Sequence, residues 1–425
     1  MGGASSCRDR RRRGAPAGVT LAVALSVVAA ACSAEGDDAA ESTTTAPSTT
    51  VPAPRIDDGL LRLGLLLPTE APLVADAIST TAQATVAEIN AAGGVLGRDV
   101  ELVPVAEGAS ASEVTQVVTE LVDAGVDGVI GPITSTHAIT AVDIASSSDV
   151  LTCSPSATAS ILDDVPDDML FFRTIASDTV QAVAIAETAE NTGARSVSIV
   201  HVDDAFGRPY ANAVEEALPD RSLRLVSTVG FSTGDDLADL LTTVVDDGAD
   251  VLVLLAAGPE LASLVSVLGT VDPAAFDTVI TNDAIRSAAN QPIIAELPTS
   301  LRSRLTGVAP QIVDRRAEGE TAVFGPQVVD CVTLISLAAV QANSDAPRLI
   351  GAQMPSVSSG GRLCSSFEAC ATEINADRQI DYQGPTGLTE LNRIGDTSRA
   401  WFERFTFDET GADEFGTAGR LQITI

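Results

Sequence analysis

Short runs of apolar residues alternate with longer amphipathic stretches from about residue 60 onward. Residues Leu60–Leu67 are nearly all apolar, which is typical of a parallel strand buried on both faces. In the stretch 111–124, Val114, Val118 and Leu121 recur at helical spacing and form one apolar face. The same reasoning predicts strands at 60–67, 100–105, 126–130, 197–202, 223–231, 251–256 and 279–281, and helices at 75–92, 111–124, 208–218, 236–247 and 260–269.

This alternation of strands and helices indicates the fold class. Strand–helix–strand units are right-handed and build doubly wound parallel sheets. The pattern occurs in two blocks, one before about residue 175 and one after it, and 425 residues exceed what one hydrophobic core usually organises. We therefore expect an α/β protein with two doubly wound lobes.

The N-terminus predicts export from the cytoplasm. A basic segment at residues 8–13 precedes the apolar run Ala17–Ala31. That run reaches only about 22 Å at about 1.5 Å per residue, which is too short to span a bilayer. A basic start, a short apolar middle and small residues before a break indicate a signal peptide. The break at Val28–Cys32 resembles the bacterial lipoprotein cleavage box, although Ala29 stands where Leu is usual.

That resemblance implies that residues 1–31 are removed as a signal peptide and that the Cys32 thiol is acylated, which anchors the protein to the membrane. The plainer alternative is an ordinary secretory signal beside a chance cysteine. Residues 33–54 are rich in Ser, Thr, Ala, Asp and Pro and bury too little apolar surface to order themselves. We therefore expect a disordered tether over residues 32–58.

The charge of the chain excludes two classes of partner. The formal net charge is −33, and all of the basic residues are Arg. A protein this acidic repels nucleic acid and anionic membrane surfaces. We interpret the excess of acidic residues as a solvated protein surface and not as a specific cation-binding site.

Four cysteines follow the tether, and in an exported protein an even number suggests disulfides. Cys364 and Cys370 enclose five residues in a polar region, so we expect them to pair. The spacing, with no nearby His, argues against a metal site. Cys153 and Cys331 either pair or stay as buried free thiols.

Six sequence landmarks carry a family resemblance. The segment Ile89–Leu102, INAAGGVLGRDVEL, looks like the signature after the first helix of leucine/isoleucine/valine-type periplasmic binding proteins. Five more landmarks follow in the family's order. They are Gly131-Pro132 followed by Thr134–Thr136, then Ser154–Thr158, Phe172–Thr174, Asp204–Gly207 and Thr281–Ala284.

The resemblance implies the type I periplasmic-binding-protein fold, in which two lobes are joined by three hinge crossings. We place these crossings near residues 176, 309 and 384. The implied lobes are 59–175 plus 310–383 and 176–309 plus 384–425. In such open sheets the ligand lies beyond the carboxyl ends of the strands, where the loops that begin at Gly131, Ser154, Asp203 and Asn282 fall.

The resemblance also implies the ligand-binding residues for a zwitterionic amino acid. Ser135 and Thr158 match the hydroxyls that hold the ligand carboxylate, since a neutral hydroxyl donates without adding charge. The backbone carbonyl of Ser156 and the carboxylate of Asp283 match the acceptors for the ammonium group. Phe206 matches an aromatic residue that packs on the ligand.

Plainer roles stay open for several of these residues. Ser135, Thr158 and Asp283 could cap helices, and Phe206 could belong to the core. Two aromatic positions of the family are absent, because the loop 68–73 has no aromatic residue and Gly258 replaces the second one. Glu70 and Leu73 could contribute to the pocket instead.

We therefore expect an extracytoplasmic solute-binding lipoprotein that captures an amino acid, with branched-chain amino acids favoured, and delivers it to an ABC permease in the membrane. We expect a monomer without cofactor or metal. An alternative is a sensor of the same fold that does not transport. An exported hydrolase is the second alternative, but no Gly-x-Ser-x-Gly or His-Glu-x-x-His motif occurs, and His137 and His201 are the only histidines.

Overall fold

The computed structural model describes residues 57–272, 274–310, 324–387, 390–414 and 419–424. The predicted signal peptide, Cys32 and nearly all of the predicted tether lie outside these residues.

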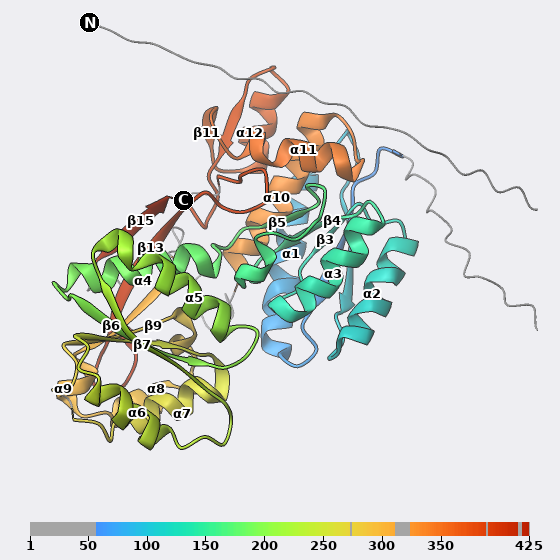
Figure 1. Cartoon of the computed structure of the whole chain (residues 1–425). Helices are drawn as coiled ribbons and strands as arrows, with labels where there is room; N and C mark the ends of the chain where they lie inside the picture. Colours follow the sequence, from blue (N-terminus) through green and yellow to red (C-terminus); the bar gives the residue numbers. More distant parts are fainter. Residues whose placement is uncertain (1–56, 273, 311–323, 388–389, 415–418, 425) are drawn as a thin grey trace, which may run out of the picture. The chain divides into compact units, whose positions relative to one another are not determined.

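The first sheet has five parallel strands in the order β2-β1-β3-β4-β5 (Figure 1). This is a doubly wound order, and it places the carboxyl ends of all of the strands at one edge. The strand bounds are Arg62–Leu67 (β1), Glu101–Ala106 (β2), Gly128–Ile130 (β3), Leu151–Ser154 (β4) and Phe171–Arg173 (β5).

Helices cover both faces of the first sheet. Leu63 and Leu65 of β1 point into a core that also holds residues of α1 and α10, whereas Leu66 points into a core with α2 and α3. Alternate residues of one strand therefore serve opposite faces, as the period of a strand requires. The helix bounds are Pro72–Ala91 (α1), Ala111–Asp123 (α2), Ser135–Ser147 (α3), Gly325–Ala342 (α10), Pro347–Val357 (α11) and Phe367–Ile374 (α12), with a 3₁₀ turn at Ser160–Leu162 (η1).

Among the described residues, α10 alone has the length and apolar composition of a membrane span. Of its most apolar window, 78% is buried within the protein. The helix therefore forms the centre of the core on its side of the first sheet.

The second sheet has eight strands, with β14-β13-β10-β9-β8-β6-β7 in order and β15 beside β13. The central strands are parallel, and β13 runs antiparallel to β10. The strand bounds are Ser196–Val202 (β6), Arg224–Phe231 (β7), Val251–Leu255 (β8), Thr278–Thr281 (β9), Leu305–Pro310 (β10), Arg399–Phe407 (β13), Asp413–Glu414 (β14) and Arg420–Thr424 (β15). A small separate sheet pairs Arg362–Cys364 (β11) with Ile380–Tyr382 (β12).

Helices also cover both faces of the second sheet. Residues of α4 and α5 pack in one core, and residues of α6 and α7 pack in the core of the other face. The helix bounds are Asp178–Asn191 (α4), Gly207–Ala217 (α5), Leu237–Asp246 (α6), Gly258–Leu268 (α7), Gln291–Glu296 (α8) and Thr299–Arg302 (α9), with 3₁₀ turns at Pro219–Arg221 (η2) and Asp283–Arg286 (η3).

The chain passes between the two sheets more than once. It leaves the first sheet after β5 and enters α4, and the C-terminal strand β13 joins the second sheet (Figure 1). Leu391 still packs in a core of the first sheet, although it follows the crossing predicted near residue 384. Ala400 is the next core residue and belongs to the second sheet.

Both remaining pairs of cysteines form disulfides in the structure. Cys364 is bonded to Cys370, the pairing that the spacing predicted. Cys153 on β4 is bonded to Cys331 on α10, and the sequence separation is 178. The second bond therefore fastens a sheet strand to the central helix of its core.

The two disulfides should differ in their contribution to stability. A bridge removes more entropy from the unfolded chain when it closes a longer loop. We expect the double substitution Cys153→Ala, Cys331→Ala to lower the free energy of unfolding by about 5 kcal/mol, and Cys364→Ala, Cys370→Ala by about 2 kcal/mol. Urea denaturation followed by circular dichroism measures both; equal losses would contradict the loop-length argument.

Candidate functional site

Ser135 lies in the first turn of α3, at the carboxyl edge of the first sheet. The helix is capped by Thr134, whose side chain accepts a hydrogen bond from the His137 N–H. Ser135 is therefore not the cap. Its Oγ instead accepts a hydrogen bond from the Ala159 N–H at 3.2 Å, which joins this turn to the next loop.

The loop after β4 carries Ser156 and Thr158. The Ser156 Oγ donates to the Ile133 carbonyl at 2.7 Å, which fixes the loop against the end of β3. The Thr158 carbonyl accepts a hydrogen bond from the Asp178 N–H at 2.8 Å, and the Thr158 hydroxyl bonds to the Asp178 carboxyl group. Since a hydroxyl has one proton to donate, Asp178 competes with any ligand for the Thr158 hydroxyl.

Asp283 is the first residue of η3, and the capping position before it belongs to Asn282. Its Oδ1 accepts a hydrogen bond from the Gln181 Nε2 at 3.0 Å. The same nitrogen donates to the Val308 carbonyl at 2.9 Å. The buried Gln181 side chain therefore orients the Asp283 carboxylate from α4.

Phe206 stands at the start of α5 and is partly buried. It packs against the cores on both faces of the second sheet. This packing supports the alternative that Phe206 is a core residue. Its ring also meets the Tyr210 ring edge to face, with 5.7 Å between the centroids. Phe206 is thus tied to a tyrosine that the sequence did not single out.

Asp178 and Tyr210 are two further polar groups beside the predicted residues. Asp178 is 2% exposed, and burial raises its pKa to about 7, with the nearby Asp283 charge acting in the same direction. Tyr210 is 1% exposed, and its hydroxyl has no hydrogen-bond partner. Burial raises the pKa of this tyrosine well above its usual value, and the charges of Asp178 and Asp283 add to the shift.

Only a weak signal in the sequence points to Asp178 and Tyr210. An acidic residue in the first turn of a helix is a common feature that stabilises the helix dipole, so Asp178 had an ordinary explanation. Tyr210 lies at helical spacing from apolar residues and looks like core. Their burial beside Asp283 depends on contacts between elements that are distant in sequence.

Arg173 fixes the loop after β4 through hydrogen bonds to the backbone of that loop. Its buried guanidinium donates to the Ala157 carbonyl at 3.3 Å and to the Ala159 carbonyl at 3.2 Å. It also forms ion pairs with Asp396, through Nη2 at 2.9 Å from Oδ2, and with Asp163. Because two carboxylates already engage it, Arg173 is a structural cation rather than a free site for an anion.

The two histidines are engaged in local contacts. The His137 Nδ1 lies 3.0 Å from the Glu107 Oε1, and the His201 Nδ1 lies 2.8 Å from the Val202 carbonyl. The Ser135 Oγ accepts from the Ala159 N–H, while the His137 ring is engaged by Glu107. The residues that the structure describes contain no group of His, Cys, Asp and Glu that could hold a metal ion.

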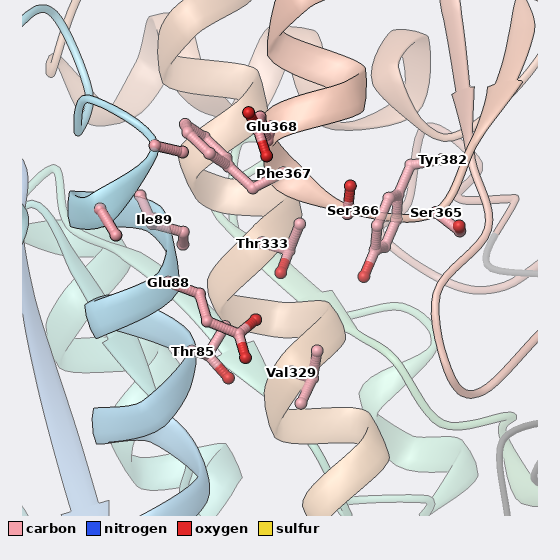
Figure 2. Close-up of a pocket in the computed structure, with 12 residues that line it drawn as sticks. Thr85, Glu88, Ile89, Val329, Thr333, Ser365, Ser366, Phe367, Glu368 and Tyr382 are labelled. Carbon is pink, nitrogen blue, oxygen red and sulfur yellow. The ribbon is translucent and has the colours of Figure 1, made fainter.

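A pocket of about 400 Å³ lies elsewhere, between α1, α10 and α12 (Figure 2). Glu88 and Thr85 of α1 face Thr333 of α10 across it, and Glu368 lies at its rim. None of the predicted ligand residues lines this pocket. It is open to solvent at exposed residues such as Glu88 and Glu368, so we place the candidate site at the strand ends instead.

Glu70 and Leu73, which we considered as further pocket residues, are both exposed, Leu73 strongly so. Gly258 begins α7 with a positive φ of 55°, in the position where the family has an aromatic residue. The structure therefore supplies no aromatic replacement from these two loops.

Comparison with known proteins matches the model of a family described as "Periplasmic binding protein" to residues 61–281, from β1 to β9. The Leu/Ile/Val-binding protein BraC3 of Rhizobium johnstonii is 30% identical over 231 residues, which are 53% of this chain and 62% of that protein. The Leu/Ile/Val-binding protein of Escherichia coli K12 is 27% identical over 187 residues, 44% of this chain and 51% of that protein. The match thus spans between half and two thirds of these relatives.

Solved structures agree on the fold over a longer range. An ABC transporter substrate-binding protein from Desulfitobacterium hafniense, in complex with Leu, has a TM-score of 0.64 at 18% identity and covers 84% of this chain and 99% of its own. LivJ of Streptococcus pneumoniae, in complex with isoleucine, has a TM-score of 0.63 at 20% identity, with coverage of 85% and 99%. The predicted type I fold is confirmed, and the chain belongs to the periplasmic binding protein family.

Proposed function

We propose that this protein binds an amino acid outside the cytoplasm, with branched-chain amino acids favoured, and hands it to an ABC permease. Membership of a family of solute-binding proteins supports binding rather than catalysis. The Leu/Ile/Val-binding relatives support an amino acid as the solute.

One observation supports the position of the site most strongly. Three hydrogen bonds, separated by short stretches of chain, engage three of the predicted residues: Ala159 N–H to Ser135, Asp178 N–H to Thr158, and Gln181 to Asp283. Gln181 and Asp178 lie one turn apart on α4, so their side chains share a face. The loops that carry Ser135 and Thr158 at the first sheet and Asp283 at the second are therefore both in contact with the first turn of α4 or its neighbouring loop.

In this proposal the ligand's two charges are held by different groups. The carboxylate accepts from the Ser135 hydroxyl, the Thr158 hydroxyl and backbone N–H groups, and the ammonium donates to Asp283 and the Ser156 carbonyl. Arg173 does not take part because Asp163 and Asp396 neutralise it. Phe206 packs on the ligand's apolar part.

The mechanism we propose is ligand-driven closure. A ligand that contacts residues of both lobes favours the closed arrangement by its differential affinity for that state. The permease then recognises the closed form. Acylation of Cys32 keeps the protein at the membrane surface, near that permease.

A thermal-shift screen tests the solute class. Purified full-length chain should be stabilised by at least one branched-chain amino acid, by about 2.7 kcal/mol when the ligand is at one hundred times its Kd. Benzoate belongs in the panel because a solute-binding protein from R. palustris with the same fold is in complex with benzoate. Stabilisation by benzoate and by no amino acid would overturn the proposed ligand class.

Asp283 should be required for binding of the ammonium group. Asp283→Asn keeps an oxygen that Gln181 can bond, so folding is preserved, but it removes a charge-assisted hydrogen bond. We expect the amino-acid Kd to rise about 10- to 150-fold. Asp277→Asn, which neutralises an exposed acid immediately before β9, is the matched control. Calorimetric titration measures both, and an unchanged Kd for Asp283→Asn would remove the residue from the site.

Cys32 should decide where the protein resides. Cell fractionation should find the wild-type chain in the membrane fraction and labelled by radioactive palmitate. Cys32→Ser should abolish the label, because no thiol remains to be acylated. Wild-type protein that is unlabelled and soluble outside the cytoplasm would favour the ordinary secretory signal.

A further inference from the structure

A buried carboxylate lies at the carboxyl end of β2 and contacts the first turn of α3. Glu107 is 2% exposed, and its Oε1 lies 3.0 Å from the His137 Nδ1. An ionised carboxylate only accepts hydrogen bonds, so the His137 Nδ1 donates. Within the part of the chain that the structure describes, His137 is the basic side chain that pairs with Glu107. Removal of one partner from a buried pair is costly, because the other partner is left without compensation.

The Glu107 carboxylate engages the chain on both sides of Ser135. Its Oε2 accepts a hydrogen bond from the Ile133 N–H at 3.4 Å, two residues before the serine. Its Oε1 engages the His137 ring, two residues after the serine. The His137 N–H in turn donates to the Thr134 Oγ1, which caps α3. One side chain from the end of β2 therefore fixes both the entry into α3 and the first turn of that helix.

The loop after β4 holds the same turn from the other side of β3. The Ser154 Oγ donates to the Pro132 carbonyl at 2.8 Å, and the Ser156 Oγ donates to the Ile133 carbonyl at 2.7 Å. The Ser135 Oγ accepts a backbone N–H of this loop. Because that bond uses a lone pair of the hydroxyl and not its proton, the proton of Ser135 stays available to a ligand.

The loop after β2 is also fixed locally. The Gly108 N–H donates to the Thr69 Oγ1 at 3.0 Å, which joins this loop to the loop after β1. Gly108 has a positive φ of 83°, and a Cβ at this position would lie 2.4 Å from the Cβ of Glu113. A side chain is therefore excluded at residue 108. This turn keeps Glu107 at the end of β2, within reach of α3.

We propose that Glu107 and His137 form a positioning pair that sets the Ser135 hydroxyl for the carboxylate group of the solute. This inference rests on the proposed function and extends it, because it names two residues that act through Ser135. His137 also compensates the charge of Glu107, since an uncompensated negative charge next to the turn that binds the solute carboxylate repels that group. Glu107 without His137 therefore opposes binding, whereas the intact pair supports it.

Calorimetric titration of the full-length chain with L-leucine tests the pair. Glu107→Gln keeps the shape of the side chain but removes its charge and one acceptor oxygen, so the Kd should rise about 2- to 13-fold. His137→Leu leaves the buried Glu107 carboxylate without compensation, so the Kd should rise about 10- to 150-fold. The double substitution Glu107→Gln, His137→Leu leaves no uncompensated charge. Its Kd should therefore fall back to about 2- to 13-fold above that of the wild type.

A double-mutant cycle with Ser135 separates positioning from a general loss of stability. If the pair acts through Ser135, Glu107→Gln should not raise the Kd further once Ser135→Ala is present. Two independent effects would instead multiply. All of the variants are titrated below the lowest melting temperature in the set, so that every chain compared is folded.

Glu101→Gln is the matched control. Glu101 is an exposed glutamate at the opposite end of the same strand, β2, where its Oε2 lies 3.0 Å from the Arg62 Nε. The substitution makes the same chemical change as Glu107→Gln and also breaks an ion pair. Because the carboxyl ends of the strands lie at the other edge of the sheet, Glu101→Gln should leave the Kd for L-leucine unchanged.

The outcomes separate the two proposals. If the wild type binds L-leucine and neither Glu107→Gln nor His137→Leu changes the Kd, the positioning pair is overturned and the proposed function stands. A double variant that binds no better than His137→Leu also overturns the pair. So does a Glu107→Gln effect that is equally large with and without Ser135→Ala. A wild-type chain that binds neither L-leucine nor any other amino acid of the thermal-shift panel overturns both proposals.

Discussion

The arrangement of the candidate site depends on a carboxyl group buried at the start of α4. A carboxylate removed from water is stable only when it is hydrogen-bonded and paired with a positive charge, or when it takes up a proton. The Thr158 hydroxyl bonds to the Asp178 carboxyl group, and this bond and the charge of Arg173 both lower the pKa of Asp178. Burial outweighs them and raises the pKa to about 7. The group is therefore held between two protonation states near neutral pH.

The scaffold keeps this carboxyl group where it is. Arg173 binds the backbone carbonyls of the Ala157–Ala159 segment and the Asp396 carboxylate, which joins the loop after β4 to the chain segment that leads into β13. The disulfide from Cys153 to Cys331 fastens the strand before that loop to α10. The loop is thus fixed at both ends, and the hydrogen bond from Asp178 to Thr158 is made between positions that the rest of the fold determines.

Much of the fold could be predicted from the sequence because its strands are buried on both faces. The strand predicted at 60–67 is β1 at Arg62–Leu67, and the helix predicted at 75–92 is α1 at Pro72–Ala91. By contrast, α4 was not predicted. Its buried residues include Asp178, Gln181 and Thr188 as well as alanines on several sides, so no apolar stripe marks it. The buried polar residues that obscure the helical pattern of α4 include Asp178 and Gln181, which bond to the candidate residues Thr158 and Asp283.

Sequence landmarks led to Ser135, Thr158 and Asp283, but they did not lead to Asp178 or Tyr210. A landmark reports local residue order, whereas the charge state of Asp178 follows from how Thr158, Asp283 and Arg173 surround it. Likewise, the unpartnered hydroxyl of Tyr210 is a property of the packed core and not of α5 alone. The environment of the proposed site therefore depends on contacts between residues that are distant in sequence.

The most direct measurement of the central claim is the titration of the Asp178 carboxyl carbon by NMR. The account predicts that this carboxyl group titrates near pH 7, because burial withdraws it from water. A titration at the ordinary value of an aspartic acid would contradict the claim that burial holds this carboxyl group between two protonation states.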